Sequence, residues 1–390
     1  MMISNSKMEA VSDTMDNTSR LHYMDNLRAL AMLAGVVFHA GLAYSVLLHN
    51  FWPTADVGRS AVVDVFLWFS HLFRMPLFFV VAGFFAALLV TKQGIGAMLR
   101  NRFRRVLLPF ILFWPVVYFA MTSLTVHAAN NVENLSPLLM FLKSWFAQAN
   151  RPTAPPSLMH LWFLPYLFCF CILVWVVNTL EIKWLKSCFV KLRPSILLGL
   201  VPLILLPALV TLSVPFPAPE SFFPQAWALL FYGVYFGFGY QLFSHPSLIE
   251  NITPFALRLL LAALASYAVF FMLITTQNHL QPKMLRHVMQ AILESYIGFW
   301  MTLVCLIYGK RLLDRSNRLL RYLADASYWV YIVHLPVLFA IQYVLLDVAA
   351  LWQIKFAISL VATLIIAFVS YQLLVRHTVL GRLLNGKRRD

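Results

Sequence analysis

Long uninterrupted runs of apolar residues, separated by short polar or basic segments, constrain this chain more than any other feature. A helix needs about 20 apolar residues to cross a hydrocarbon core roughly 30 Å thick. Of the 390 residues, 61% are hydrophobic and 12% are charged. The runs lack the alternation that a strand of a membrane barrel requires. The sequence therefore predicts an all-α, polytopic transmembrane helical bundle and excludes a water-soluble core.

The apolar runs predict ten helices. They cover approximately residues 26–48, 61–90, 104–127, 158–180, 195–214, 225–244, 254–276, 287–309, 325–346 and 352–375. We expect a disordered cytoplasmic tail over 1–21, one transmembrane domain over 22–376 and a basic cytoplasmic tail over 377–390. The segment 128–157 is too polar and proline-rich to span, and it is long enough to cover a site.

Basic residues follow the second, fourth and eighth expected helices and gather again near the C-terminus, whereas Lys283 and Arg286 are an exception. The basic residues that fit this pattern are Lys92, Arg100, Arg102, Arg104, Arg105, Lys183, Lys186, Lys191, Arg193, Lys310, Arg311, Arg315, Arg318, Arg321, Arg382, Lys387, Arg388 and Arg389. Cytoplasmic loops carry an excess of Lys and Arg, so we expect both termini in the cytoplasm. Because the net charge of +15 comes from such short clusters, we expect no nucleic-acid partner.

The sequence contains no recognisable metal-ligand set. Its four cysteines lie in or beside apolar runs without metal-ligand spacing and are expected to pack; they are Cys169, Cys171, Cys188 and Cys305. A serine or cysteine nucleophile motif and a phosphate-binding glycine loop are also absent from the sequence. We therefore expect no metal site, and we look for chemistry among ionisable residues inside the apolar runs.

Arg28 and His39 are the first such residues. A central arginine costs about 2.5–3.5 kcal/mol on insertion scales, so buried ionisable groups normally face an internal cavity. Eleven helical steps separate the two by roughly 16 Å and keep them on a similar face, so one cavity can hold both. An imidazole suits removal of a hydroxyl proton, and an arginine suits an anionic ligand. The alternatives are a hydrogen-bonded structural histidine and an arginine that reaches the lipid headgroups.

The second expected helix carries Asp64, His71 and Arg74 at spacings that place them near one face. An arginine this deep needs a carboxylate, a carbonyl or a bound anion beside it. Two interpretations stay open for Arg74: an ion pair with Asp64 or Glu294, or contact with the ligand. Pro76 in the same run predicts a kink, a strong tilt or a break.

An arginine cluster follows this helix and comprises Arg100, Arg102, Arg104 and Arg105. Guanidinium groups match phosphate oxygens in geometry, so the cluster is a candidate site for the phosphates of an acyl carrier such as coenzyme A. The alternative is that these arginines only set the orientation of the protein in the membrane.

Further candidates lie in later helices. His160 and Trp162 open the fourth helix as candidate acceptor-side groups, although Trp162 also fits the interfacial aromatic belt. His334 and Glu294 are candidates to orient His39 or to replace it as the base. Asp325 suits an N-cap of the ninth helix.

Taken in order, these motifs resemble the acyltransferase 3 family of membrane proteins. The motifs are Arg28 and His39 with ten residues between them, Arg102-x-x-Arg105, His160-Leu161-Trp162 and Tyr331-x-x-His334-x-Pro336. The resemblance covers about residues 22–375. The stretch from Phe73 to Phe85 is similar to the branch of the family that succinylates osmoregulated periplasmic glucans.

The resemblance implies transfer of an acyl group from cytoplasmic acyl-coenzyme A, with succinyl-coenzyme A as one candidate, to a hydroxyl of a periplasmic or surface glycan. It implies a multi-pass protein of the bacterial inner membrane, whose partners are acyl-coenzyme A as a co-substrate, the glycan and membrane lipid, with no tightly bound cofactor. Arg28 and His39 match the family's essential pair, and Arg102 and Arg105 match its donor-handling pair. His39 is then a general base or an acyl relay. The rivals are a transporter or flippase for an anionic solute or glycan intermediate, and a non-catalytic scaffold or sensor.

Overall fold

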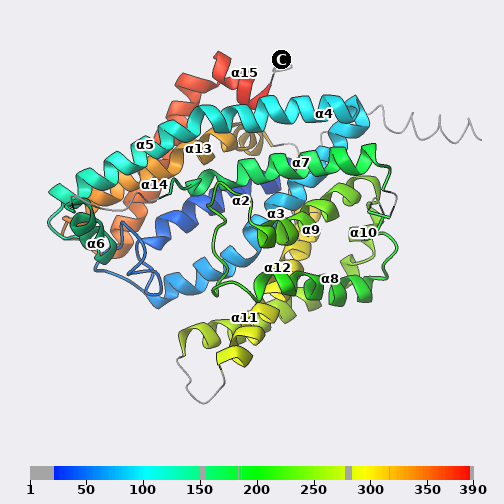
Figure 1. Ribbon diagram of the computed structural model, residues 1–390, viewed down its shortest axis with the longest axis horizontal. Coiled ribbons are helices and arrows are strands. Elements are labelled where there is room, and N and C mark those ends of the chain that lie inside the picture. Colours follow the sequence, from blue (N-terminus) through cyan, green and yellow to red (C-terminus); the bar gives the residue numbers. More distant parts are fainter. Residues whose placement is uncertain are drawn as a thin grey trace, which may run out of the picture.

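The computed structural model describes residues 22–148, 155–182, 184–185, 187–276, 283–315 and 317–386. This part of the chain is all helical and contains no strand (Figure 1). The N-terminal tail predicted over 1–21, and residues 149–154 of the predicted cover, lie outside the described residues.

The described helices differ widely in length. In chain order they are α2 (His22–Leu42), α3 (Ala61–Gln93), α4 (Ile95–Arg102), η1 (Phe103–Leu107), α5 (Leu108–Asn131), α6 (Pro137–Phe146), η2 (Met159–Trp162), α7 (Phe163–Thr179), α8 (Pro194–Leu209), α9 (Ala226–Ser244), α10 (Ser247–Glu250), η3 (Thr253–Phe255), α11 (Ala256–Thr275), α12 (Lys283–Leu313), α13 (Arg318–Leu346), α14 (Trp352–Ser370), η4 (Tyr371–Val375) and α15 (Val379–Asn385).

Seven helical segments among the described residues are long and apolar enough to cross a membrane. They are Ala61–Gln93, Ile95–Asn131, Met159–Thr179, Ser247–Thr275, Lys283–Leu313, Arg318–Leu346 and Trp352–Val375. The chain is therefore a multi-pass membrane protein, as its apolar runs predict. The number of ten crossings and the cytoplasmic position of both termini stay predictions.

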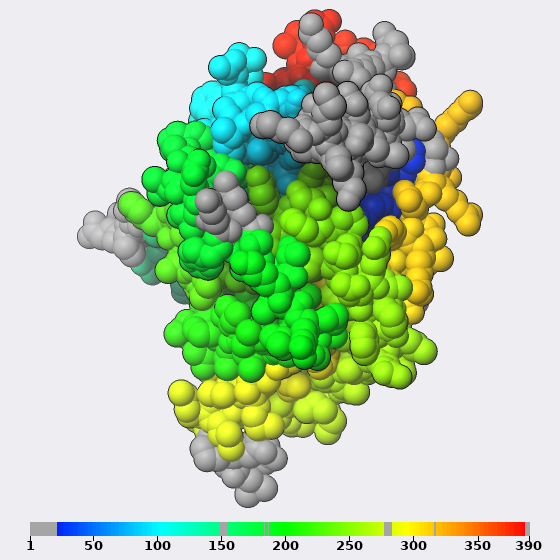
Figure 2. Space-filling model, turned by 90° about the vertical axis from the view of Figure 1, so that its right-hand side faces the viewer, coloured from blue at the N-terminus to red at the C-terminus, as the bar shows by residue number. Residues whose placement is uncertain are grey.

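The connections rich in basic residues share one face of the molecule. Figure 2 shows on this face α4 in cyan, the segment between α7 and α8 in green, and the segment between α12 and α13 in orange. These are the connections that the sequence assigns to the cytoplasm.

Glycines let α3 and α9 pack backbone against backbone. A Cβ atom added to Gly83 would lie 2.0 Å from the carbonyl oxygen of Phe236, and one added to Gly239 would lie 1.9 Å from that of Val80. Small residues permit such close approach of membrane helices. The contact fixes α3, which carries His71 and Arg74, against α9.

α3 is one continuous helix of 33 residues with Pro76 inside it, so a break at this proline is wrong. Proline lacks an N–H and leaves the carbonyl four residues earlier, that of Leu72, without its helical partner. A Cβ on Gly298 of α12 would lie 2.9 Å from that carbonyl oxygen. The neighbouring backbone therefore packs directly on the proline site, and such packing supports a proline inside a membrane helix.

A buried ion pair holds the connection between α2 and α3. Lys355 Nζ of α14 lies 2.6 Å from Asp56 Oδ2, and the two side chains are 6% and 8% exposed. In addition, Thr54 Oγ1 donates to Gln342 Oε1 at 2.7 Å, and Gln342 Nε2 donates to the carbonyl of Ala40 at 2.9 Å. Residues almost three hundred positions apart thus fix a loop that lies at the site.

The connection after α5 is partly helical. α5 continues to Asn131, and α6 follows after Ser136, whose Oγ accepts the backbone N–H of Leu139 at 3.1 Å and donates to the carbonyl of Pro53 at 2.7 Å. This part of the predicted cover is therefore attached to the loop between α2 and α3.

Candidate active site

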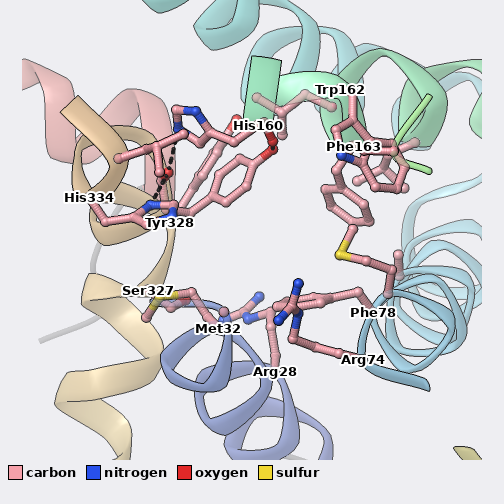
Figure 3. Close-up of a pocket in the computed structure, with 18 of the residues that line it drawn as sticks. Arg28, Met32, Arg74, Phe78, His160, Trp162, Phe163, Ser327, Tyr328 and His334 are labelled. Carbon is pink, nitrogen blue, oxygen red and sulfur yellow. Dashed lines mark hydrogen bonds between the residues drawn. The ribbon is translucent and has the colours of Figure 1, made fainter. Parts of the chain in front are cut away.

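A cavity of about 730 Å³ runs through the bundle between α2, α3, α7 and α13. At one end it is lined by Arg102 and Arg105, and at the other by Pro53, Leu138 and Glu220. Figure 3 shows side chains from these helices projecting into the same space. Arg28 and His39 both line it, as their spacing on one helix predicts.

Four histidines line the middle of the cavity, and three of them are held by backbone carbonyls. His71 Nε2 donates to the carbonyl of Phe216 at 2.8 Å. His334 Nδ1 lies 2.8 Å from the carbonyl of Tyr331. His160 Nε2 lies 3.1 Å from the same carbonyl. A carbonyl only accepts, so each of these nitrogens carries its ring's proton, and in the neutral imidazole the other nitrogen is an acceptor.

The sequence around Pro336 explains how His160 is held. Proline has no N–H, so α13 leaves the carbonyl of Ile332 without its usual helical partner. His160 Nε2 lies 3.2 Å from that oxygen, and the Tyr331 hydroxyl donates to the carbonyl of His160 at 2.6 Å. The Tyr331-x-x-His334-x-Pro336 motif thus fixes η2 against α13.

His39 differs from the other three histidines because neither ring nitrogen has a hydrogen-bond partner among the described residues, and Nδ1 is buried. Its ring centroid lies 5.3 Å from that of His334 and 6.2 Å from that of Trp52, on which it stacks. His39 is therefore the cavity histidine whose nitrogens remain available to a substrate.

Glu294 does not lie with these groups. It is absent from the residues that line the cavity, and its Oε1 accepts the backbone N–H of Phe216 at 3.1 Å. The carbonyl of Phe216 accepts from His71, so Glu294 is connected to the site through the loop that carries Phe216. The structure brings His334, and not Glu294, beside His39.

Arg74 is 7% exposed and lines the cavity without an ion pair to any described carboxylate. Asp64 instead accepts from the Ser45 hydroxyl and from the backbone N–H groups of Val46 and Leu47. The ion-pair interpretation of Arg74 with Asp64 or Glu294 is therefore wrong. Its guanidinium carbon lies 4.1 Å from the ring centroid of Phe38, a cation–π contact.

The charge of Arg28 is partly neutralised by Asp25. Its Nη2 lies 3.2 Å from Asp25 Oδ1 and 3.4 Å from the carbonyl of Ala324, and its Nε is buried without a hydrogen-bond partner. The guanidinium also lies over the ring of Phe85, at 5.6 Å. Arg28 thus faces the cavity with unused donor capacity.

The arginine cluster divides between the cavity and the surface. Arg102 and Arg105 line the cavity, whereas Arg100 and Arg104 are exposed and do not. Residues three apart share a helix face. The π-helical turn η1 carries Arg105 next to α4, and π-helical turns occur often at functional sites.

α15 lies at this arginine end. Leu384 and Asn385 line the cavity, and Asn385 Nδ2 donates to the carbonyl of Asp325 at 2.8 Å. Gly386 has a φ of +83°, and a Cβ there would lie 1.9 Å from Arg105 Nη2. Part of the segment predicted as a basic tail is therefore a wall of the site.

Trp162 is buried, and its ring lies 5.2 Å from that of Tyr232, so the aromatic-belt interpretation does not describe it. Asp325 lies seven residues inside α13, which is capped by Asn317 Oδ1, a 2.8 Å acceptor of the Leu319 N–H. The predicted cap at Asp325 is therefore wrong, because the helix begins earlier than its apolar run.

Trp52 and Glu220 belong to the site but were not predicted from the sequence. Trp52 stacks on His39 from a loop, and Glu220 lines the cavity while accepting from Ser157 Oγ at 2.8 Å. An isolated carboxylate in a proline-rich connection was the available signal for Glu220. Within the described ranges, no group of three or more His, Cys, Asp or Glu side chains is arranged to hold a metal ion.

Comparison with known families defines the class of protein. Residues 21–372 match the acyltransferase domain of the acyltransferase 3 family, so the chain belongs to this family. It is therefore a membrane acyltransferase, as the resemblance of its sequence motifs implies. The resemblance to the family is confirmed.

Particular relatives agree with the expected branch. The chain is 26% identical over 378 residues to glucans biosynthesis protein C of Escherichia coli K12, covering 94% of this chain and 95% of the relative. The same values hold for glucans biosynthesis protein C of Escherichia coli O157:H7. No solved structure matches the chain.

Proposed function

We propose that this protein is an O-acyltransferase of the bacterial inner membrane that moves an acyl group from cytoplasmic acyl-coenzyme A to a hydroxyl of a periplasmic glycan. The observation that carries the proposal is a single cavity that joins Arg102 and Arg105 to a histidine with free ring nitrogens. The relatives named for glucan biosynthesis support a glucan as the acceptor. Succinyl is the acyl group to test first.

Arg102 and Arg105 hold the donor phosphates in this proposal. Guanidinium groups bind phosphate oxygens by paired, charge-assisted hydrogen bonds. The donor's arm follows α2 past Arg28, over roughly 16 Å, and places the thioester at His39. Glu220, at the far end of the cavity, accepts hydrogen bonds from hydroxyls of the neutral acceptor.

His39 acts as the general base. It takes the proton of the acceptor hydroxyl while the hydroxyl oxygen bonds to the acyl carbon, and the bond from that carbon to the coenzyme A sulfur then breaks. The departing sulfur takes the proton. The rings of His39 and His334 lie 5.3 Å apart, centre to centre, without a hydrogen bond between them. His334 Nδ1 already donates to a carbonyl, so His334 Nε2 is an acceptor, and in this proposal it orients His39 through the Nδ1–H when substrate binds.

The test uses purified protein in liposomes, with succinyl-coenzyme A added on one side, periplasmic glucan on the other, and mass spectrometry of the glucan. His39→Gln is expected to lower the transfer rate by about 10²–10⁴-fold, the usual contribution of general acid–base catalysis. The matched control is His127→Gln, at an exposed histidine of α5.

An ester formed by the wild type and the control but not by His39→Gln supports the proposal. Equal rates for all three proteins refute the role of His39. Movement of glucan or of an anionic solute across the membrane, without any ester or consumption of acyl-coenzyme A, would assign the protein to the transporter alternative.

A further inference from the structure

Arg74 is a buried cation at the centre of the cavity without a counter-charge. Its side chain is 7% exposed, its Nη1 has no hydrogen-bond partner, and no described carboxylate forms an ion pair with it. Figure 3 shows the side chain directed from α3 into the space also faced by Arg28 and His334. Burying a guanidinium without a counter-charge is unfavourable, and a bound anion would reduce this cost.

An anion bound to Arg74 would lie close to His39. The ring of Phe38 lies 4.1 Å from the guanidinium carbon and 5.4 Å from the ring centroid of His39. The imidazole of His39 and the guanidinium of Arg74 therefore contact the same phenyl ring. A short acyl chain whose carbonyl lies at His39 can therefore extend past this ring to Arg74.

The phosphates of the donor cannot serve as this anion. In the proposed function they bind Arg102 and Arg105 at the end of the cavity where α15 lies. Arg74 lies instead beside Phe38, which neighbours His39 on α2 and lies roughly 15 Å along that helix from Arg28. The second anionic group must belong to the part of the donor that reaches His39, which is the acyl group.

We infer that Arg74 binds the distal carboxylate of a short dicarboxylic acyl group and thereby selects such donors over uncharged acyl groups. The inference rests on the proposed acyl transfer. A planar guanidinium pairs with a carboxylate through two parallel hydrogen bonds. An acetyl group would leave Arg74 buried and unpaired, so its transfer is disfavoured by the same charge that favours a succinyl group.

The experiment compares succinyl-coenzyme A with acetyl-coenzyme A as donors for the reconstituted protein, by kcat/KM for each. The wild type is expected to prefer the succinyl donor by about 100-fold or more, the scale of losing one partner of a buried charge pair. Arg74→Gln is expected to remove this preference by lowering succinyl transfer while acetyl transfer falls little or rises. Arg258→Gln, at an exposed arginine of α11, is the matched control.

Equal losses with both donors in Arg74→Gln, or a wild type that prefers acetyl, overturn the inference while leaving acyl transfer intact. No transfer from either donor by the wild type overturns the proposed function itself.

A second variant keeps the test valid if Arg74→Gln folds poorly. Arg74→Lys retains the charge without the planar fork, so a reduced succinyl preference is expected. A lysine variant that loses the same share of its activity with both donors overturns the inference.

Discussion

The ion pair between Lys355 and Asp56 offers a sharp test of how this bundle holds its site. Replacement of Lys355 by methionine keeps the length of the side chain and removes its charge. Asp56 would stay 8% exposed, with the Gly58 N–H at 2.8 Å as a remaining partner. Removing one partner of a buried pair typically costs about 3–5 kcal/mol, and we expect that loss in the free energy of unfolding.

Unfolding by denaturant in mixed micelles measures this loss, and a matched control is available. Lys310 lies 3.3 Å from Glu250 in a pair whose side chains are 43% and 59% exposed. Exposed pairs contribute about 0–1 kcal/mol, so Lys310→Met is expected to change little. The double variant Asp56→Leu with Lys355→Met removes both buried charges and should recover most of the loss.

The same substitution should also slow transfer. The loop that Asp56 anchors carries Trp52, which stacks on His39, whereas Arg102 and Arg105, the proposed donor site, lie at the other end of the cavity. We therefore expect Lys355→Met to lower kcat more than it raises the KM for the donor. A loss of stability no larger than that of Lys310→Met, or a double variant no more stable than Lys355→Met alone, would refute the reasoning.

Two further predictions concern the donor end and the helix packing. Arg102→Ala and Arg105→Ala should each raise the KM for acyl-coenzyme A by about tenfold or more, the effect of losing a charge-assisted hydrogen bond. Arg104→Ala should leave this KM near the wild-type value, because Arg104 is exposed and does not line the cavity. Equal effects of all three substitutions would mean that the arginine cluster serves only to orient the protein in the membrane. Gly239→Ala should lower the free energy of unfolding by about 1–3 kcal/mol, because its Cβ would lie 1.9 Å from the carbonyl oxygen of Val80. Gly237→Ala is the control, since the nearest atom to a Cβ there is 3.7 Å away. Denaturation of both variants measures the difference, and equal stability of the two contradicts the prediction.

Features that depend on one helix could be predicted from the sequence. Arg28 and His39 line one cavity because eleven residues complete about three turns. Arg102 and Arg105 share a face for the same reason, and this spacing separates them from Arg104. The apolar runs predicted a multi-pass helical protein because membrane thickness sets a minimum helix length.

Features that depend on contacts between distant segments could not be predicted. The residue types do not say that His160 binds the carbonyl freed by Pro336, because that contact joins residues 172 positions apart. Likewise, Arg74 and Glu294 were reasonable partners by charge, yet Glu294 is held by the backbone of a loop. Helix ends inside polar sequence are also poorly marked, which explains the misplaced cap at Asp325.

The position of α15 affects how this protein can be handled in the laboratory. Gly386, the last residue that the structure describes, lies against Arg105 at the wall of the proposed donor entrance. A C-terminal affinity tag or fluorescent fusion would therefore begin within a few residues of the proposed entrance for acyl-coenzyme A. Transfer rates measured before and after removal of the tag by a protease show whether the tag obstructs this entrance.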